Sequence, residues 1–155
     1  LAQAAQETGW GQKVLPGSNN IFNIKDSPDW KGATRMYKVP EYINGKKVYM
    51  DSPFRVYGSY QEGLEDRIAF LRDNPRYAAA GLFDNGTKGN LRKEADALQK
   101  GHYATDPHYA DHMAHVFEGP TMTRALKEAQ AREAAAAAAQ SAQSAQSQPS
   151  TPPVP

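Results

Sequence analysis

The stretch TRMYKVPEYINGKKVYMD, residues 34–51, decides the fold class of this chain. Its polar and apolar residues alternate on both sides of Asn44-Gly45, and Asn-Gly between alternating segments is the strongest short-range signal for a β-hairpin. Pro40 lies in the first predicted strand. Because proline cannot donate a ladder hydrogen bond, it indicates an edge strand there. The stretch therefore predicts a small antiparallel hairpin.

Helical signals dominate the residues after the hairpin. Ser59-x-x-Glu62 is a capping box that opens a helix, and its predicted apolar stripe is Leu64, Ile68 and Leu71. Asn74-Pro75 ends that helix and starts another. Two further helices are predicted, over residues 90–101 with Leu91, Ala95 and Leu98 in register, and from Asp106-Pro107 to Gly119-Pro120 with Tyr109, Met113, Val116 and Phe117 buried. Helices segregated from a small antiparallel sheet mean an α+β fold, with a cleft expected between a helical lobe and a hairpin lobe.

Upstream of the hairpin, AQAAQETGWG at residues 2–11 predicts a short helix that ends near Gly9. On a helical wheel Glu7 lies about 60° outside the apolar face, on the border between core and surface. A half-shielded carboxyl group keeps its proton to higher pH, as a general acid requires. Trp10 follows directly and places an indole near this carboxyl group.

Glu41 supplies a second carboxylate, from the first strand of the hairpin. Glycoside hydrolysis uses two carboxyl groups across a cleft: one protonates the leaving oxygen, and the other acts as nucleophile or as base for water. Sugars also stack on aromatic rings, and the irregular stretches carry Trp10, Phe22, Trp30, Tyr42, Tyr57 and Tyr103. These residues favour a glycosidase.

Six motifs occur in order between Leu1 and about Phe117: AQAAQETGWG, NNIFNIK, Trp30-Lys31-Gly32, EYINGKKVYMDSPFRVYGSYQEG, NPRYA and HYATDPHYA. Together they resemble the FlgJ-type peptidoglycan hydrolase domains, which are β-N-acetylglucosaminidases of glycoside hydrolase family 73. The resemblance implies a lysozyme-like α+β fold, with a helical lobe and a small antiparallel hairpin lobe flanking a cleft. It also implies cleavage of peptidoglycan between N-acetylglucosamine and N-acetylmuramic acid.

The resemblance assigns roles residue by residue. The family's acid falls on Glu7, its second carboxylate on Glu41, and its cleft tyrosine on Tyr103, with Tyr109 as the other candidate. We expect substrate contacts from Trp10, Phe22, Asn23, Trp30, Tyr57 and Tyr109. No cofactor and no metal are expected. The expected partners are peptidoglycan glycan strands in the periplasm and, through a domain that would precede Leu1, flagellar rod proteins.

Several alternatives stay open at this point. Glu41 could act as base for water, or the substrate's own N-acetyl oxygen could attack the anomeric carbon, oriented by Tyr103. A lytic transglycosylase would need only one carboxylate. A non-catalytic wall-binding or rod-assembly module would keep the cleft without turnover.

His108, His112 and His115 form a rival signal, because histidines four residues apart on a helix can bind zinc. The sequence has no Glu between them as H-E-x-x-H requires. We therefore interpret them as a solvated stripe, in which Asp111 pairs with His115.

Composition limits the number of domains and the classes of function that this chain can have. The chain has 155 residues, 39% hydrophobic and 23% charged, which suits one globular domain with appendages. A net charge of +1 gives no strong attraction to nucleic acid or membrane surfaces. Cysteine is absent, which excludes disulfides and thiol chemistry. No apolar run is long enough to insert into a bilayer.

The two ends of the chain give the domain boundaries. No initiator Met precedes Leu1, and we expect a fragment of a longer protein. From Ala134 onward the sequence has no charged residue and turns to Ala, Gln, Ser and Pro. We expect a hydrolase domain at 1–130 and a tail at 131–155, helical to about residue 139 and then disordered.

Overall fold

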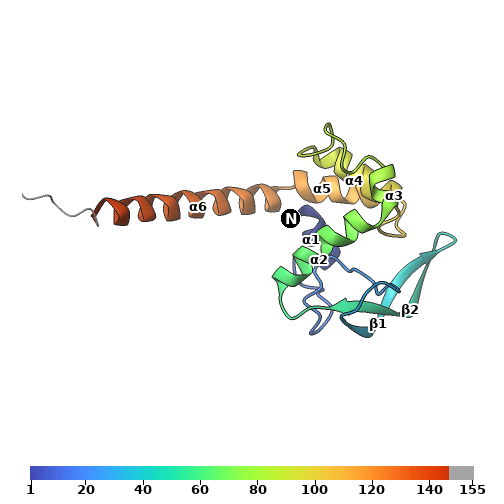
Figure 1. Cartoon of the computed structure of the whole chain (residues 1–155). Helices are drawn as coiled ribbons and strands as arrows, with labels where there is room; N and C mark the ends of the chain where they lie inside the picture. The colour runs from blue at the N-terminus through green and yellow to red at the C-terminus, as the bar shows by residue number, and fades with distance from the viewer. Residues whose placement is uncertain (147–155) are drawn as a thin grey trace, which may run out of the picture. The chain divides into compact units, whose positions relative to one another are not determined.

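The computed structural model describes residues 1–146, and its contacts divide the chain into two compact units, Leu1–Phe117 and Glu118–Pro155. The first unit holds a two-stranded sheet and five helices. Figure 1 shows how they are arranged. The elements are α1 (Ala2–Thr8), β1 (Ala33–Ile43), β2 (Lys46–Val56), α2 (Tyr60–Asp73), α3 (Pro75–Ala79), α4 (Leu91–Lys100) and α5 (Tyr109–Glu118), with α6 (Pro120–Gln146) in the second unit. The predicted α+β class is confirmed.

The hairpin forms where the sequence predicts it. β1 and β2 pair antiparallel, with Ile43 opposite Lys46 and Glu41 opposite Val48. Asn44 and Gly45 have φ values of 50° and 74°, which are the left-handed conformations that a two-residue type I′ turn needs. The turn extends away from the helices (Figure 1). Since the sheet has two strands, Pro40 lies on an edge as predicted.

The predicted helix ends are also confirmed. The Ser59 hydroxyl accepts a hydrogen bond from the Glu62 backbone N–H, and the Glu62 carboxylate accepts one from Gly58 N–H. Pro75 takes the first position of α3. The Asn90 side chain accepts from Lys93 N–H at the start of α4, which ends before Gly101. Side-chain caps of this kind satisfy backbone groups that the helix itself cannot pair.

Two predicted helix faces are partly wrong. In α2, Leu71 is buried, but Leu64 and Ile68 are 47% and 49% exposed. Gly63 faces the interior instead, where an added Cβ would lie 3.1 Å from the Asn19 carbonyl oxygen. Residues that pack closely or make polar contacts face the interior from this helix. A prediction from the spacing of apolar residues alone therefore gave the wrong buried face.

In α5 the buried residues are Tyr109, Ala110, Met113 and Ala114. Val116 is only half-buried and Phe117 is 40% exposed, contrary to prediction. The small Ala110 and Ala114 complete the inward face, because the helix packs closely along that side.

The loop between α1 and β1 belongs to the core. Asn20 is fully buried, and its amide donates to the carbonyl oxygens of Ile24 and Arg55 at 2.8 and 2.9 Å while accepting from Ile24 N–H. Phe22 and Ile24 are 4% and 2% exposed. A fully satisfied buried amide holds an irregular segment in one conformation. The loop thus fixes the position of the residues that follow α1.

The second unit consists of α6 within the described residues. This helix continues to Gln146, beyond the limit near residue 139 that composition suggested. The boundary between the compact units follows Phe117, and the domain end expected at residue 130 stays a prediction. The predicted disorder at residues 147–155 lies outside the described part of the chain. Within residues 1–146, no helix has both the length and the apolar character needed to cross a membrane.

Candidate active site

Glu7 lies at the end of α1, where the chain turns sharply. The Thr8 hydroxyl donates to the Ala4 carbonyl oxygen at 2.6 Å and accepts from Gly11 N–H at 2.8 Å. Gly9 ends the helix in the left-handed conformation, with φ 53°. The side chains of α1 that face the interior include Gln3 and Thr8, and Glu7 is half-buried beside them. Its predicted place on the border between core and surface is confirmed.

Two donors from distant segments hold the Glu7 carboxylate. The Tyr109 hydroxyl, from α5, donates to Glu7 Oε1 at 2.8 Å. The Asn23 amide donates to Glu7 Oε2 and to the Glu7 backbone carbonyl oxygen, both at 3.0 Å. Asn23 has a left-handed φ of 50°, which Asn tolerates better than most residues. Each carboxylate oxygen therefore has one fixed donor.

The pKa of Glu7 is raised above its ordinary value. Burial is the larger cause, because it disfavours the charged form, and the hydrogen bonds from Tyr109 and Asn23 oppose it by stabilising the carboxylate. The net direction favours a proton on Glu7 at higher pH than an exposed glutamate would hold one. This is the property that a general acid needs.

Tyr109 and Tyr103 form a stacked pair behind this carboxylate, with ring centroids 5.9 Å apart. Burial raises the pKa of both phenols, and the nearby Glu7 charge raises each further, so both remain neutral donors. The Tyr103 hydroxyl donates to the Phe22 carbonyl oxygen at 2.6 Å. The structure thus gives the direct contact with Glu7 to Tyr109, and Tyr103 supports the Tyr109 ring.

Glu41 lies on β1 and contacts two other segments. Its carboxylate forms an ion pair with Lys25 and accepts a hydrogen bond from the Thr105 hydroxyl at 3.1 Å. The Thr105 oxygen also lies 3.4 Å from the Tyr42 backbone nitrogen as an acceptor. The side chain of Glu41 is 13% exposed. These contacts join the hairpin to the loop after α1 and to the segment before α5.

The predicted aromatic contacts divide into exposed and buried rings. Trp10 is 43% exposed and has a left-handed φ of 61°. Phe22 and Tyr57 are 4% and 5% exposed, so their rings offer little surface to a sugar. Trp30 packs edge-on against Tyr57, with centroids 5.7 Å apart. Tyr42 is also 43% exposed. Among the predicted aromatic rings, exposure therefore favours Trp10, Trp30 and Tyr42 as sugar platforms.

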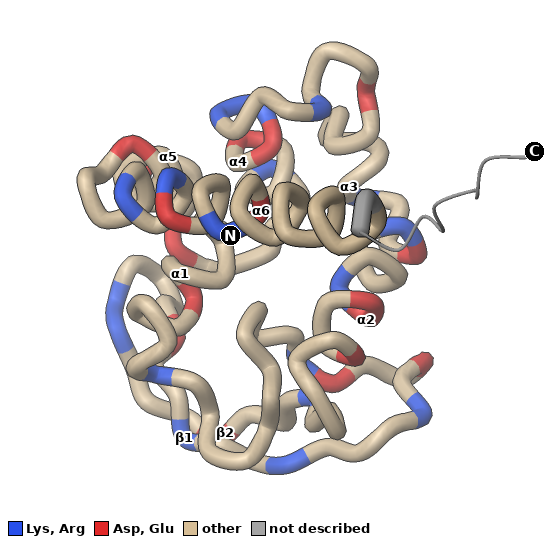
Figure 2. The backbone as a smooth tube through the Cα atoms, turned by 90° about the vertical axis from the view of Figure 1, so that its left-hand side faces the viewer, with Lys and Arg blue, Asp and Glu red and all other residues tan. Residues whose placement is uncertain are grey.

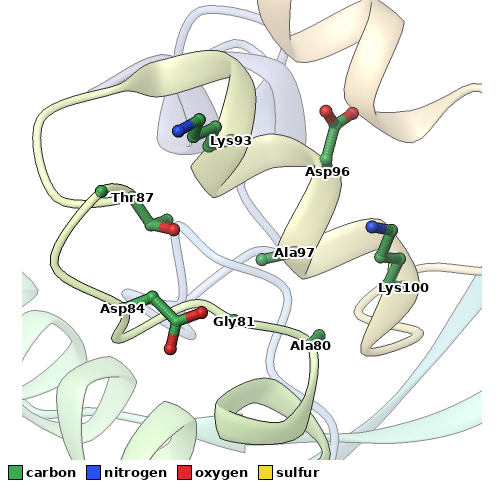
Figure 3. Close-up of a pocket in the computed structure, with 9 residues that line it drawn as sticks. Ala80, Gly81, Asp84, Thr87, Lys93, Asp96, Ala97 and Lys100 are labelled. Atoms are coloured by element: carbon green, nitrogen blue, oxygen red, sulfur yellow. The ribbon is translucent and has the colours of Figure 1, made fainter.

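Trp30 and Tyr57 line a hollow of about 610 Å³ beside α2, together with Gly32, Ala33, Val56, Gly58, Glu62, Glu65, Asp66 and Ala69. A second hollow, of about 430 Å³, lies between α4 and the segment before it. Figure 3 shows its labelled side chains, with Lys93, Asp96 and Lys100 on the helix and Asp84 and Thr87 across from them. None of the predicted site residues lines this second hollow.

Of the three histidines, His112 of α5 contacts an acidic side chain at the surface. His112 Nδ1 lies 2.8 Å from Asp106 Oδ2. Asp111 pairs with Arg92 at 2.7 Å, so the predicted Asp111–His115 pair is wrong, because α4 brings a cation closer. Within residues 1–146, His, Cys, Asp and Glu form no group of three or more that could hold a metal ion.

Acidic and basic residues are interspersed along the backbone (Figure 2).

Sequence reasoning did not identify two residues beside the site. The Gln3 amide donates to the Tyr109 hydroxyl at 2.9 Å, and Arg67 of α2 donates to Gln3 at 2.6 Å. The position of Gln3 one turn before Glu7 was visible in the sequence. Nothing local to Arg67 connects it with a residue 64 positions earlier.

Comparison with known proteins gives a consistent result over the first unit. The family model for glucosaminidase, described as mannosyl-glycoprotein endo-beta-N-acetylglucosaminidase, matches residues 1–121. The peptidoglycan hydrolase FlgJ of Escherichia coli K12 is 42% identical over 123 residues, which are 76% of this chain and 38% of that relative. The chain therefore spans well under half of the length of this curated relative.

Solved structures agree with the sequence comparison. A peptidoglycan hydrolase mutant from Sphingomonas sp. A1 has a TM-score of 0.74 and 37% identity, covering 82% of both chains. The glycoside hydrolase domain of Salmonella typhimurium FlgJ has a TM-score of 0.58 and 35% identity, covering 90% of this chain and 81% of that one. With a family model matching residues 1–121 and this agreement in fold, the chain belongs to the glucosaminidase family, glycoside hydrolase family 73.

Proposed function

We propose that this chain hydrolyses β-1,4 glycosidic bonds of peptidoglycan as an N-acetylglucosaminidase, with Glu7 as the general acid. One observation carries the proposal: Glu7 is a half-buried carboxyl group whose pKa is raised by burial while two fixed donors, Tyr109 and Asn23, contact its oxygens. Family membership supplies the reaction class, and the names of the FlgJ relatives supply peptidoglycan as the substrate.

The proton-transfer step follows from this geometry. Protonated Glu7 gives its proton to the glycosidic oxygen as the bond to the anomeric carbon breaks, so the leaving sugar departs as a neutral alcohol. The carboxylate that remains accepts hydrogen bonds from the Tyr109 hydroxyl at 2.8 Å and the Asn23 amide at 3.0 Å. Because these donors are already in place, they stabilise the new negative charge without reorganising.

The second step adds water to the anomeric carbon. In this proposal Glu41 accepts a proton from that water, with inversion as the outcome. Glu41 lies on the hairpin, and its contacts to Lys25 and Thr105 fix the hairpin against two other segments. Attack by the substrate's N-acetyl oxygen is the alternative; Tyr103 would orient that group after giving up its bond to the Phe22 carbonyl oxygen.

One observation favours a second candidate, a lytic transglycosylase. The Glu41 carboxylate is already engaged by an ion pair with Lys25 and a hydrogen bond from Thr105, whereas Glu7 is a carboxyl group whose raised pKa suits a proton donor. A transglycosylase needs a single carboxyl group, because the muramic acid's own C6 hydroxyl closes onto its anomeric carbon to give an anhydro product.

The biological setting belongs to the same proposal. Peptidoglycan of a Gram-negative cell lies in the periplasm, which we propose as the location. Flagellar rod proteins are proposed partners, in line with the FlgJ name of the relatives. A hydrolase at that place would open the wall for the growing rod.

Digestion of purified sacculi tests the proposal. Wild-type chain, Glu7→Gln, Glu41→Gln and the exposed-site control Glu128→Gln are compared by release of soluble fragments, with mass spectrometry of the products. Glu7→Gln is expected to lower the rate by about 10²–10⁴, with Glu128→Gln unchanged. Reducing N-acetylglucosamine ends support the glucosaminidase. Anhydro-muramoyl ends support the transglycosylase, and binding without release supports a non-catalytic module. Wild-type digestion by Glu7→Gln would exclude Glu7 as the acid.

A further inference from the structure

Four side chains form a continuous hydrogen-bonded chain that ends on Glu7. Arg67 Nε of α2 donates to Gln3 Oε1 at 2.6 Å, and Gln3 Nε2 lies 2.9 Å from the Tyr109 hydroxyl oxygen. The Tyr109 hydroxyl lies 2.8 Å from Glu7 Oε1. This chain of hydrogen bonds runs from α2 to α1, then to α5, and back to α1. Arg67 is the member farthest from the carboxyl group.

The chemistry of the first member fixes the direction of every bond in this chain. An arginine side chain has donors only, so the atom of Gln3 that faces Arg67 must be the amide oxygen. The amide nitrogen then faces Tyr109 and donates to the phenol oxygen. With that oxygen accepting, the single hydroxyl proton of Tyr109 is left to donate to Glu7. Arg67 thus settles an amide orientation that would otherwise have two choices.

Burial prevents water from replacing these bonds. Gln3 and Tyr109 are 4% and 2% exposed, and Arg67 is half-buried with its guanidinium 5.0 Å from the centre of the Phe22 ring. A buried polar group without a partner is unfavourable, so the members of the chain must satisfy one another. Changing one member therefore changes the arrangement of its neighbours.

Without the Arg67 donor, the chain could run in the opposite direction. The Gln3 amide could turn its oxygen toward Tyr109, the Tyr109 hydroxyl could donate to it, and a protonated Glu7 could donate to the Tyr109 oxygen. In that reversed arrangement the acid proton of Glu7 would be engaged inside the protein. It would be harder to remove and harder to deliver to a leaving oxygen.

We propose that Arg67 is a positioning residue that, through Gln3, points the Tyr109 hydroxyl at Glu7 and keeps the acid proton of Glu7 free for the substrate. The proposal rests on the proposed role of Glu7 as general acid. Among the described residues, Tyr109 of α5 and Tyr103 of the segment before it are the titratable groups that interact with Glu7, and the Arg67 charge acts on the Tyr103 phenol.

Removing the donor gives the first test. Arg67→Met keeps an unbranched stem against Phe22 and removes the donors. Since the reversed chain stabilises protonated Glu7, the alkaline limb of the pH–rate profile is expected to move up by about half a pH unit or more. The rate on the plateau is expected to fall several-fold. Arg67→Lys retains a donor-only group and is expected to restore the wild-type limb.

A double-mutant cycle separates the effect of Arg67 on the direction of the hydrogen bonds from the effect of its charge. Gln3→Leu removes the acceptor that the reversed chain needs, so the alkaline limb is expected to stay near that of wild type. The double variant Arg67→Met/Gln3→Leu is expected to behave like Gln3→Leu, which would mean that losing Gln3 cancels the effect of losing Arg67. A shift that persists in the double variant would show that Arg67 acts only through its charge, and would overturn the proposal.

A direct titration makes the test independent of turnover. The Glu7 carboxyl carbon is followed by NMR in the full chain, labelled with ¹³C-glutamate and assigned by comparison with Glu7→Gln, and circular dichroism checks the fold of each variant. The same order of pKa values is expected: Arg67→Met above wild type, the double variant near it. An inactive Glu7→Gln with unchanged Arg67→Met profiles and titration refutes only the role of Arg67. Wild-type activity in Glu7→Gln refutes the proposed function.

Discussion

Asp66→Ala tests the polar contact that joins the hairpin to the helices. Arg55 of β2 is 7% exposed at its side chain, and its Nη1 lies 3.0 and 2.9 Å from the two carboxylate oxygens of Asp66 on α2. The same guanidinium donates to the Ser27 hydroxyl at 2.8 Å and to the Lys25 carbonyl oxygen at 3.1 Å. The Tyr57 hydroxyl also donates to Asp66. The substitution therefore affects two buried donors at once.

The expected loss follows from what each donor retains. Breaking a buried ion pair costs about 3–5 kcal/mol, and Arg55 keeps two acceptors, which places its share near the lower end, about 3 kcal/mol. The Tyr57 hydroxyl loses its acceptor at a buried position, which adds about 1 kcal/mol. The free energy of unfolding is expected to fall by about 4 kcal/mol, a large fraction of the 5–15 kcal/mol typical of a domain.

Urea denaturation followed by tryptophan fluorescence measures this change, since Trp30 lies 4.6 Å from the Arg55 guanidinium. Asp111→Ala is the matched control. It removes an ion pair with Arg92 in which both side chains are more than half exposed, and about 0–1 kcal/mol is expected. Asp66→Asn retains one acceptor and is expected to fall between the two. A loss for Asp66→Ala no larger than that of the control would refute the reasoning.

Three further predictions concern pH, the hairpin and the tail. Because the folded state raises the pKa of Glu7 from 4.5, the contribution of Glu7 to stability declines as pH rises above that value. In scanning fluorimetry Glu7→Gln is therefore expected to melt at a higher temperature than wild type at pH 8 and to lose this advantage at pH 4. An equal difference in melting temperature at both pH values would contradict the prediction. Lys25→Met removes a partner that is 47% exposed, so urea denaturation is expected to show a change below about 1 kcal/mol, and a larger loss would mean that the pair with Glu41 is not screened. A chain that ends at residue 130 is expected to digest sacculi at the wild-type rate, and a slower rate would assign a role to the tail.

Local signals predicted the parts of the fold that local physics determines. The Asn44-Gly45 turn forms because two consecutive left-handed residues suit a hairpin whatever surrounds them. The caps at Ser59 and Asn90 form because their donors lie three residues away in the chain. Glu7 was placed correctly on the edge of α1 for the same reason, since a helical wheel depends only on spacing.

Contacts between distant segments could not be predicted in this way. Tyr109 lies 102 residues from Glu7, and the sequence alone left Tyr103 and Tyr109 as alternatives for a cleft tyrosine. The rings of the two stack, so only their hydroxyl partners distinguish them. The same limit explains α2, where Arg67 and Asp66 serve buried polar contacts and Leu64 and Ile68 face solvent. Apolar periodicity cannot predict the buried face of a helix when charged side chains lie on that face.

Glu7 lies on α1, so the contacts that stabilise this helix also determine the orientation of the Glu7 carboxyl group. Seven residues without a side-chain N-cap are too few for a helix to persist alone in water, so α1 depends on contacts with the rest of the fold. Gln3 bonds the Tyr109 hydroxyl, Gln6 bonds the Tyr109 carbonyl oxygen at 3.3 Å, and Arg67 bonds Gln3. The bonds that dock α1 on α5 and α2 are therefore the bonds that aim Tyr109 at Glu7. A single substitution such as Arg67→Met is therefore expected to loosen the docking and misdirect the acid together. The double variant Arg67→Met/Gln3→Leu is the exception, because it weakens the docking but also removes the acceptor to which the Tyr109 hydroxyl could turn.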